Sequence, residues 1–308
     1  MAAFPTFLTA THIMFAMTQC RCTRSECCSV AKKDRLLLEY STFRERPIPV
    51  TTNPPTALDY QEFPVDQSDP RAQEPLVDLA EYEIPSFNFY ARRDGLNTPY
   101  RRCFATSDPE VRVRKSLAER LADINEELTN LGIEIYALNG FRPLSVQQEL
   151  WDFFVARARR SLKAPTDEEC IAFAGRYCSD PRSFAPDDAR TWPTHITGGA
   201  IDLTLRNKDT KEHLFFGGIF DDPSDITHTT YFEEILCSVD GDPEQLSLSD
   251  QEALQNRRLL YWAMCSAGFT NYAYEWWHFD LGTQLWAANR SLAAAGEPKH
   301  AWYGPAST

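Results

Sequence analysis

The sequence has little positive charge for its size. Its 31 Lys and Arg residues stand against 44 Asp and Glu residues, which gives the 308-residue chain a formal net charge of −13 at pH 7. Nucleic acids and anionic membranes are bound through basic surface patches, so the composition predicts neither as a partner. A small zwitterionic or cationic substrate is electrostatically easier to accommodate.

The sequence also predicts no membrane span. The apolar stretch of residues 2–17 is short, contains Thr9, Thr11 and His12, and is preceded by neither Lys nor Arg. It is therefore too polar to cross a bilayer and lacks the basic start of a signal peptide. We expect a cytoplasmic protein, with an exported one as the alternative.

A regular disulfide framework is missing as well. The nine cysteines are odd in number, and four of them crowd together at positions 20, 22, 27 and 28, which favours a reducing compartment. Seven prolines lie between Pro47 and Pro75, among many acids. We therefore predict that residues 1–75 form a poorly ordered extension, first Cys-rich and then Pro-rich, and that residues 76–308 form the functional domain.

Helical and strand periodicities alternate from residue 76 onward. The first predicted helix begins at Ser107-Asp108-Pro109 and ends before Gly132. Three further helices are predicted at about 145–160, 168–177 and 249–267, and strands at 133–138, 200–205 and 272–279. Many of the connections are short. We expect an α+β fold with a mainly antiparallel central sheet flanked by helices.

Histidine is scarce, with six in the chain, and two lie in dense polar surroundings. His195 precedes Asp202 by seven residues, and imidazole nitrogens and carboxylate oxygens are both good zinc ligands. On a straight strand the two side chains would face opposite ways, but Gly198-Gly199 permits a bend that brings them together. The alternative is a glycine turn that enters a strand, with an exposed His195.

The second dense context is Glu275-Trp276-Trp277-His278. A histidine on a metal with a carboxylate close enough to take a proton from water would have this form. The alternative is a strand with core tryptophans and a surface Glu–His pair.

A third motif, Asn139-Gly140-Phe141-Arg142-Pro143, follows a predicted strand. Pro143 stiffens the backbone beside Arg142, whose guanidinium suits an oxyanion or a carboxylate. The alternative is an arginine paired with a surface acid.

Taken in their order along the chain, the three motifs resemble the D-alanyl-D-alanine dipeptidases of the vancomycin-resistance type, within the superfamily of zinc peptidases related to hedgehog domains. That family carries Gly-Tyr-Arg-Pro, then His-x-x-Gly-x-Ala-x-Asp, then Glu-Trp-Trp-His. This chain has Gly140 to Pro143, His195 to Asp202 with Gly198 and Ala200 in place, and Glu275 to His278. The resemblance covers roughly residues 76–290 and implies a hedgehog-like peptidase fold.

The resemblance also implies a role for each matching residue. His195, Asp202 and His278 match the ligands of one zinc ion per chain. Glu275 matches the base that activates water, and Arg142 matches the residue that stabilises the tetrahedral intermediate. Asp221, in a glycine-rich loop, matches the acid that receives the free ammonium of a small dipeptide substrate such as D-Ala-D-Ala.

Three positions depart from the family pattern. Pro193 stands in place of a serine, Thr197 in place of an arginine, and Phe141 in place of a tyrosine. They affect the surroundings of the predicted site and none of its metal ligands. Two rival functions stay open: a murein D,D-carboxypeptidase or endopeptidase that acts on longer peptides, and a zinc-binding hedgehog-like module without activity.

Overall fold

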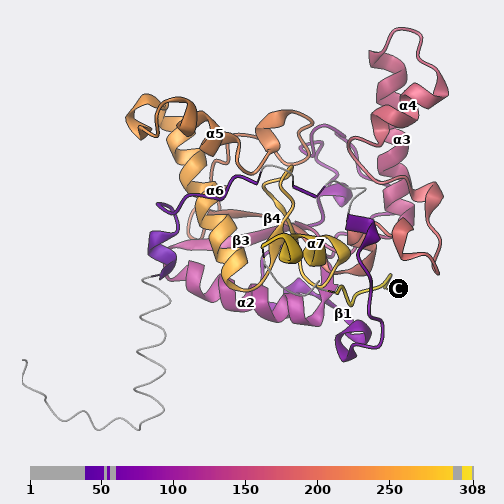
Figure 1. The fold of residues 1–308 in the computed structure, drawn as a ribbon, viewed down its shortest axis with the longest axis horizontal. Coiled ribbons are helices and arrows are strands. Elements are labelled where there is room, and N and C mark those ends of the chain that lie inside the picture. Colours follow the sequence, from indigo (N-terminus) through magenta and orange to yellow (C-terminus); the bar gives the residue numbers. More distant parts are fainter. Residues whose placement is uncertain (1–38, 52–53, 56–59, 294–299, 307–308) are drawn as a thin grey trace, which may run out of the picture. The chain divides into compact units, whose positions relative to one another are not determined.

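The computed structural model describes residues 39–51, 54–55, 60–293 and 300–306. A four-stranded antiparallel sheet in this structure carries the candidate site (Figure 1). Its strands run in the order β3 (Ile133–Asn139), β4 (Ala200–Asn207), β6 (His278–Asp280) and β5 (Thr270–Asn271). Asp202 on β4 lies directly opposite Asn139 on one side and His278 on the other. Directly opposed residues of antiparallel strands share one face, so this register places three polar side chains in one row.

A smaller, two-stranded sheet precedes this one along the chain and occupies residues that were predicted to belong to the first helix. β1 (Leu76–Asp78) pairs with β2 (Arg112–Arg114), and α2 (Lys115–Thr129) begins only after β2. The helix start predicted at Ser107-Asp108-Pro109 is therefore wrong. The carboxylate of Asp108 instead accepts a hydrogen bond from the backbone N–H of Glu110 and pairs with Arg112, which fixes a turn before the strand.

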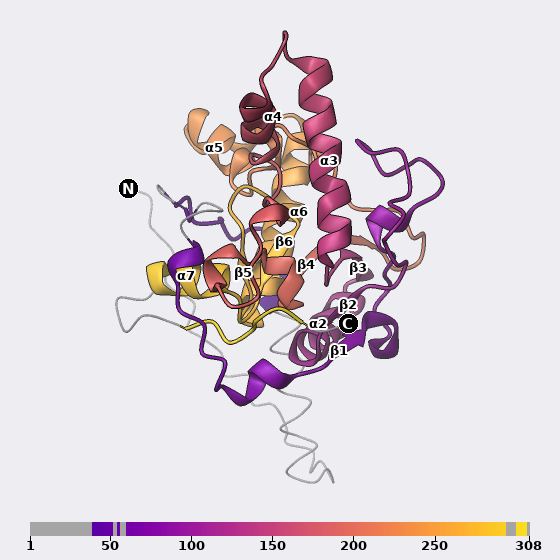
Figure 2. The same ribbon diagram turned by 90° about the vertical axis from the view of Figure 1, so that its right-hand side faces the viewer.

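The remaining helices surround the main sheet. They are α3 (Leu144–Ser161), α4 (Asp167–Ala174), α5 (Tyr231–Ser238), α6 (Leu248–Ser266) and α7 (Gln284–Ala293). α3 and α4 pack against each other and project away from the sheet as a hairpin (Figures 1 and 2). The predicted helices at 145–160, 168–177 and 249–267 correspond to α3, α4 and α6, whereas α5 and α7 were not predicted. None of the described helices is long and apolar enough to cross a membrane.

The last predicted strand is also wrong in part. Residues 272–277 form a turn between β5 and β6, and the two tryptophans lie in this turn and at its end. The turn is closed by backbone hydrogen bonds from Glu275 to Tyr272 and from His278 to Glu275. Trp276 lies out of the sheet because its backbone N–H donates to the carbonyl of Thr227 and its ring stacks on Phe216, with ring centroids 4.2 Å apart.

The folded unit begins before residue 76. Tyr40 and Phe43 are buried in the main core, and Arg44 donates a 2.6 Å hydrogen bond to Asn256 on α6. The predicted extension is therefore ordered and packed over this part, while its Cys-rich part lies outside the described residues. The Pro-rich part contains two short 3-10 turns, Tyr60–Glu62 and Pro70–Gln73.

Candidate active site

The structure brings His195, Asp202 and His278 together beside β4, where β3 ends and β6 begins. One ligand atom from each lies within 4.8 Å of the other two, and all three side chains are buried. His195 lies in the 3-10 turn Thr194–Thr197, and Gly198 follows it with φ 71°. This left-handed conformation, which glycine adopts without strain, turns the chain into β4 so that His195 and Asp202 meet.

The hydrogen bonds define which nitrogen of His195 faces the others. Its Nδ1 lies 2.8 Å from the carbonyl oxygen of Gly140, which can only accept, so we assign the proton to Nδ1; the amide Nδ2 of Asn139, 3.1 Å from the same Nδ1, then donates to Asp202. Its Nε2 lies 3.2 Å from the carboxylate of Asp202 and 3.2 Å from Nδ1 of His278. Nε2 is therefore the atom that His195 offers to a metal.

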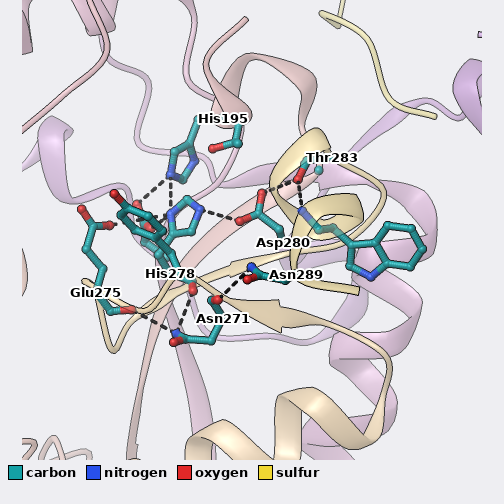
Figure 3. Close-up of polar contacts among 12 residues, drawn as sticks. His195, Asn271, Glu275, His278, Asp280, Thr283 and Asn289 are labelled. Carbon is teal, nitrogen blue, oxygen red and sulfur yellow. Dashed lines mark hydrogen bonds and ion pairs between the residues drawn. The ribbon is translucent and has the colours of Figure 1, made fainter. Parts of the chain in front are cut away.

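His278 is oriented by a second carboxylate on its far side (Figure 3). Its Nε2 lies 2.8 Å from Oδ2 of Asp280, while its Nδ1 lies 3.0 Å from Oδ1 of Asp202. Asp280 is completely buried and accepts a 2.7 Å hydrogen bond from the hydroxyl of Thr283. A carboxylate behind a ligating histidine fixes its ring and raises its basicity, and Asp280 is placed to act on His278 in this way.

The donor set fits a zinc ion. Two imidazole nitrogens and one carboxylate oxygen are the three-ligand arrangement of catalytic zinc sites, which leave a fourth position open. Burial lowers the pKa of His195 and so favours its neutral form, whereas at His278 the carboxylates of Asp280 and Asp202 outweigh burial and raise the pKa, so metal binding there releases a proton. Burial opposes ionisation of Asp202, but the charge of His278 and its hydrogen bond to Asp202 hold the pKa of this carboxyl far below the ordinary value, so the carboxylate stays charged.

Asp280 gives the first testable prediction. Asp280→Asn keeps the size of the side chain but removes the charge that faces Nε2 of His278. We expect zinc affinity to fall by about 10–100-fold, the range found for outer partners of metal-bound histidines. Titration with a competing chelator measures this, with Thr283→Ser, which keeps the hydroxyl, as the matched control. Zinc affinity within twofold of the wild type in Asp280→Asn would contradict the assignment.

Arg142 lies beside the three predicted ligands. Its Nη2 is 3.3 Å from Oδ2 of Asp202, its guanidinium lies over the ring of Tyr90 at 4.9 Å, and its side chain is 10% exposed. The corner at Pro143 begins α3, and the N–H of Arg142 donates to the carbonyl of His195. The backbone of the arginine is thus tied to the turn of the first histidine.

Glu275 lies on the open side of the site. Its Oε2 is 3.9 Å from Nδ1 of His278, and its side chain remains 31% exposed. Loss of hydration in the cleft, together with the nearby carboxylates of Asp202 and Asp221, raises the pKa of Glu275 to about 8. A carboxylate with such a raised pKa is suited to accept and return a proton near neutral pH.

Asp221 faces the same site from the loop between β4 and α5. The hydroxyls of Tyr90 and Tyr100 both donate to its Oδ2 at 3.0 Å, and among the described residues nothing donates to Oδ1. Burial and the charge of Asp202 raise the pKa of Asp221 to about 7. Oδ1 is therefore the oxygen that remains for a ligand.

One cleft joins these groups. It has a volume of about 840 Å³ and is lined by all six predicted site residues. Tyr60 and Gln61, from the predicted extension, also line it, as does the long segment between α4 and β4 through Arg176, Tyr177 and Pro193.

Sequence reasoning missed several residues that shape the site. Tyr90 and Tyr100 precede the motifs and carry no distinctive spacing, so nothing in the sequence pointed to their hydroxyls. Asn139 opens the third motif without a predicted role, yet its Nδ2 lies 3.1 Å from the carboxylate of Asp202. Asp280 is not among the missed residues: it follows His278 by two positions, and alternation along a strand predicts that both side chains share one face, as a partner that orients His278 requires.

Comparison with known proteins places the chain in a family. Residues 90–295 match the M15 peptidase family, described as D-ala-D-ala dipeptidase. D-alanyl-D-alanine dipeptidases from three bacteria are similar. The Synechocystis protein is 31% identical over 56% of this chain and 68% of its own length, that of Enterococcus faecalis 28% over 54% and 71%, and that of Escherichia coli 26% over 58% and 67%.

Among solved structures, a Zn(II) complex of a variant of the vancomycin-resistance D,D-pentapeptidase VanY matches with 15% identity. The match covers 61% of this chain and 82% of VanY, with a TM-score of 0.32. The sequence matches are the stronger finding, because the family match alone spans most of the described chain and includes every predicted site residue. The chain belongs to the D-Ala-D-Ala dipeptidase family of M15 peptidases.

Proposed function

We propose that the protein is a zinc-dependent dipeptidase that hydrolyses D-Ala-D-Ala or a closely related dipeptide. The observation that carries the proposal is the convergence of three metal-ligand side chains with Glu275, Arg142 and Asp221 on one cleft. A purely structural zinc site needs only ligands. A base and a cation around the ligands serve peptide hydrolysis, and an amine-binding acid suits a substrate with a free N-terminus.

Each side chain has a distinct task in this proposal. When bound by His195, Asp202 and His278, zinc supplies a Lewis acid that polarises the scissile carbonyl and lowers the pKa of water. Glu275 accepts the proton of the attacking water and later donates it to the leaving amine. The guanidinium of Arg142 donates to the oxygen on which negative charge develops.

Asp221 would set the length of the substrate. A carboxylate that receives a free ammonium favours binding of a substrate whose N-terminal residue is the one before the scissile bond. The two tyrosine hydroxyls on Oδ2 orient the carboxylate so that Oδ1 is available to that ammonium. A dipeptide satisfies this arrangement, whereas an acylated or extended N-terminus leaves the acid without a partner.

Asp221→Asn tests this role. We expect kcat/KM for a free dipeptide to fall by about 10–100-fold, because a net 1.5–3 kcal/mol hydrogen bond to a charged group is lost. Cleavage of an N-acylated dipeptide, which has no ammonium, should change little. The preference for free over acylated substrate would then shrink by the same factor.

The control for this prediction is Asp222→Asn, the neighbouring acid that bonds to Ser224 at the loop surface. It should leave the preference unchanged. An unaltered preference in Asp221→Asn would remove this residue from substrate recognition while leaving the metal site untouched.

The size of the cleft is compatible with the rival function, a peptidase that acts on longer peptides. A cleft of about 840 Å³ lies within the range of about 300–1,000 Å³ for pockets of drug-sized ligands, so its volume does not restrict the occupant to a dipeptide. The position of Asp221 supports the dipeptidase over that rival. Comparison of a free dipeptide with its N-acylated form separates the two functions.

The finer fold assignment belongs to the same proposal. We infer a hedgehog/D-Ala-D-Ala-peptidase-like arrangement, supported by the antiparallel order β3-β4-β6-β5 and by the ligands on β4, on β6 and on the turn before β4.

A further inference from the structure

An arginine outside the site binds the loop that carries Asp221. Arg257 lies on α6 and is 2% exposed. Within the described part of the chain it forms no ion pair with a carboxylate. Burial lowers its pKa to about 9, so it is still a cation at neutral pH. Burying a cation without a counter-ion is costly, which raises the question of what its guanidinium does.

The guanidinium donates only to backbone carbonyls, and they lie at both ends of one loop. Nε and Nη2 bond to the carbonyl of Phe216 at 2.9 and 2.7 Å, and the other donors bond to the carbonyls of Ile226 and His228. Asp221 lies between these two attachment points. The rigid fork of an arginine can hold three carbonyls at fixed angles, which a lysine ammonium cannot.

The far end of this loop also holds the turn of Glu275. The carbonyl of Thr227 accepts a hydrogen bond from the backbone N–H of Trp276, and the hydroxyl of Thr229 donates a 2.6 Å hydrogen bond to Oδ1 of Asn271. The amide of Asn271 in turn donates to the carbonyls of Glu275 and His278, both at 3.0 Å (Figure 3). These hydrogen bonds, joined by the backbone of residues 226–229, thus link Arg257 to the turn that carries the predicted base.

We infer that Arg257 is a positioning residue, which holds Asp221 and the turn of Glu275 at fixed places relative to each other. This inference rests on the proposed dipeptidase function. It adds that the spacing between the amine-binding acid and the base is set from α6, by a residue that contacts neither substrate nor metal. Reacting groups displaced by about 1 Å cost on the order of 10²-fold in rate, so the spacing matters.

The neighbouring Arg258 provides a matched control. It is 8% exposed, lies on the same helix, and forms two hydrogen bonds of 2.7 and 2.6 Å to Glu233 on α5. Glu233 also accepts from the N–H of Ile48. Arg258 thus ties α6 to α5 and to residues 45–48, away from the 216–228 loop.

The test compares Arg257→Lys with Arg258→Lys in the zinc-loaded full chain. Activity is measured per folded protein, with free and N-acylated dipeptides, well below the melting temperature of each variant. We expect Arg257→Lys to bind zinc as the wild type does, to lose at least about tenfold in kcat/KM for the free dipeptide, and to lose much of its preference for free over acylated substrate. Arg258→Lys should lower the melting temperature and leave both kinetic values unchanged.

The outcomes separate this inference from the proposed function. A wild-type protein without dipeptidase activity overturns the function. An active wild type with unchanged preference in Arg257→Lys, or with equal kinetic losses in both variants, overturns only the role of Arg257. If Arg257→Lys does not fold, Arg257→Gln, which keeps two amide donors and removes the buried charge, is judged by the same criteria.

Discussion

Replacing Glu275 with Gln is expected to lower kcat for dipeptide hydrolysis by about 10²–10⁴-fold while zinc stays bound, the range that general acid–base catalysis contributes. The amide fills the same space but cannot accept the proton of water. Glu275 lies 3.9 Å from His278 and outside the cluster of metal-ligand atoms, so the ligands keep their positions.

Two measurements on the same sample check this expectation: zinc content by elemental analysis, and the rate of release of the amino acid product. Glu212→Gln, an exposed glutamate on the loop after β4, serves as the control for loss of one negative charge. Hydrolysis near the wild-type rate in Glu275→Gln would show that another group takes the proton.

Replacing Asp202 with Asn should have an even larger effect, because it removes both the metal and the activity. Asp202 is 2% exposed and lies within 3.0–3.3 Å of His278, His195 and Arg142. Loss of its charge removes the only anionic ligand of the set and leaves Arg142 without its carboxylate. We expect zinc affinity to fall more than the roughly 10–100-fold caused by loss of an outer partner.

The melting temperature reports this loss directly. A ligand present at 100 times its Kd stabilises the folded state by about 2.7 kcal/mol, so a chelator should lower the melting temperature of the wild type. The melting temperature of Asp202→Asn should not respond to the chelator. Asp187→Asn, at an exposed acid, should respond as the wild type does. A full chelator response in Asp202→Asn would exclude Asp202 as a ligand.

The convergence of His195, Asp202 and His278 was predictable because these residues lie in compact motifs. Gly198-Gly199 between His195 and Asp202 signalled a bend, and the structure has Gly198 in the left-handed conformation at that point. The central strands β3 and β4 were likewise predictable, since each is a short run of apolar residues bounded by turn residues.

The rest depended on contacts between distant segments. Arg112–Arg114 form a strand because Leu76–Asp78 pair with them, and local helix signals around Pro109 cannot reveal that partner. The tryptophan pair was predicted as part of a strand, because the sequence does not show that the backbone N–H of Trp276 donates to the carbonyl of Thr227. Tertiary pairing overrides local preference in both cases.

The same limit applies to the groups around the site. The carboxylate of Asp221 and the hydroxyl of Tyr90 are 131 residues apart in the sequence and form a hydrogen bond in the fold. Nothing in the sequence around Arg257 indicates that it binds the carbonyls on both sides of Asp221. Such residues are found from geometry, because their partners are backbone atoms with no sequence signature.

The central claim is that one zinc ion in this cleft supports hydrolysis of a free dipeptide. The most direct measurement follows D-Ala-D-Ala hydrolysis by the purified full chain as isolated, after chelation, and after zinc is restored, with metal content determined at each step. The account predicts about one zinc per chain, activity that disappears with the metal, and recovery when zinc is returned. A protein that binds zinc and hydrolyses neither D-Ala-D-Ala nor any other D,D- or L-dipeptide would contradict it and would indicate a zinc-binding module without activity.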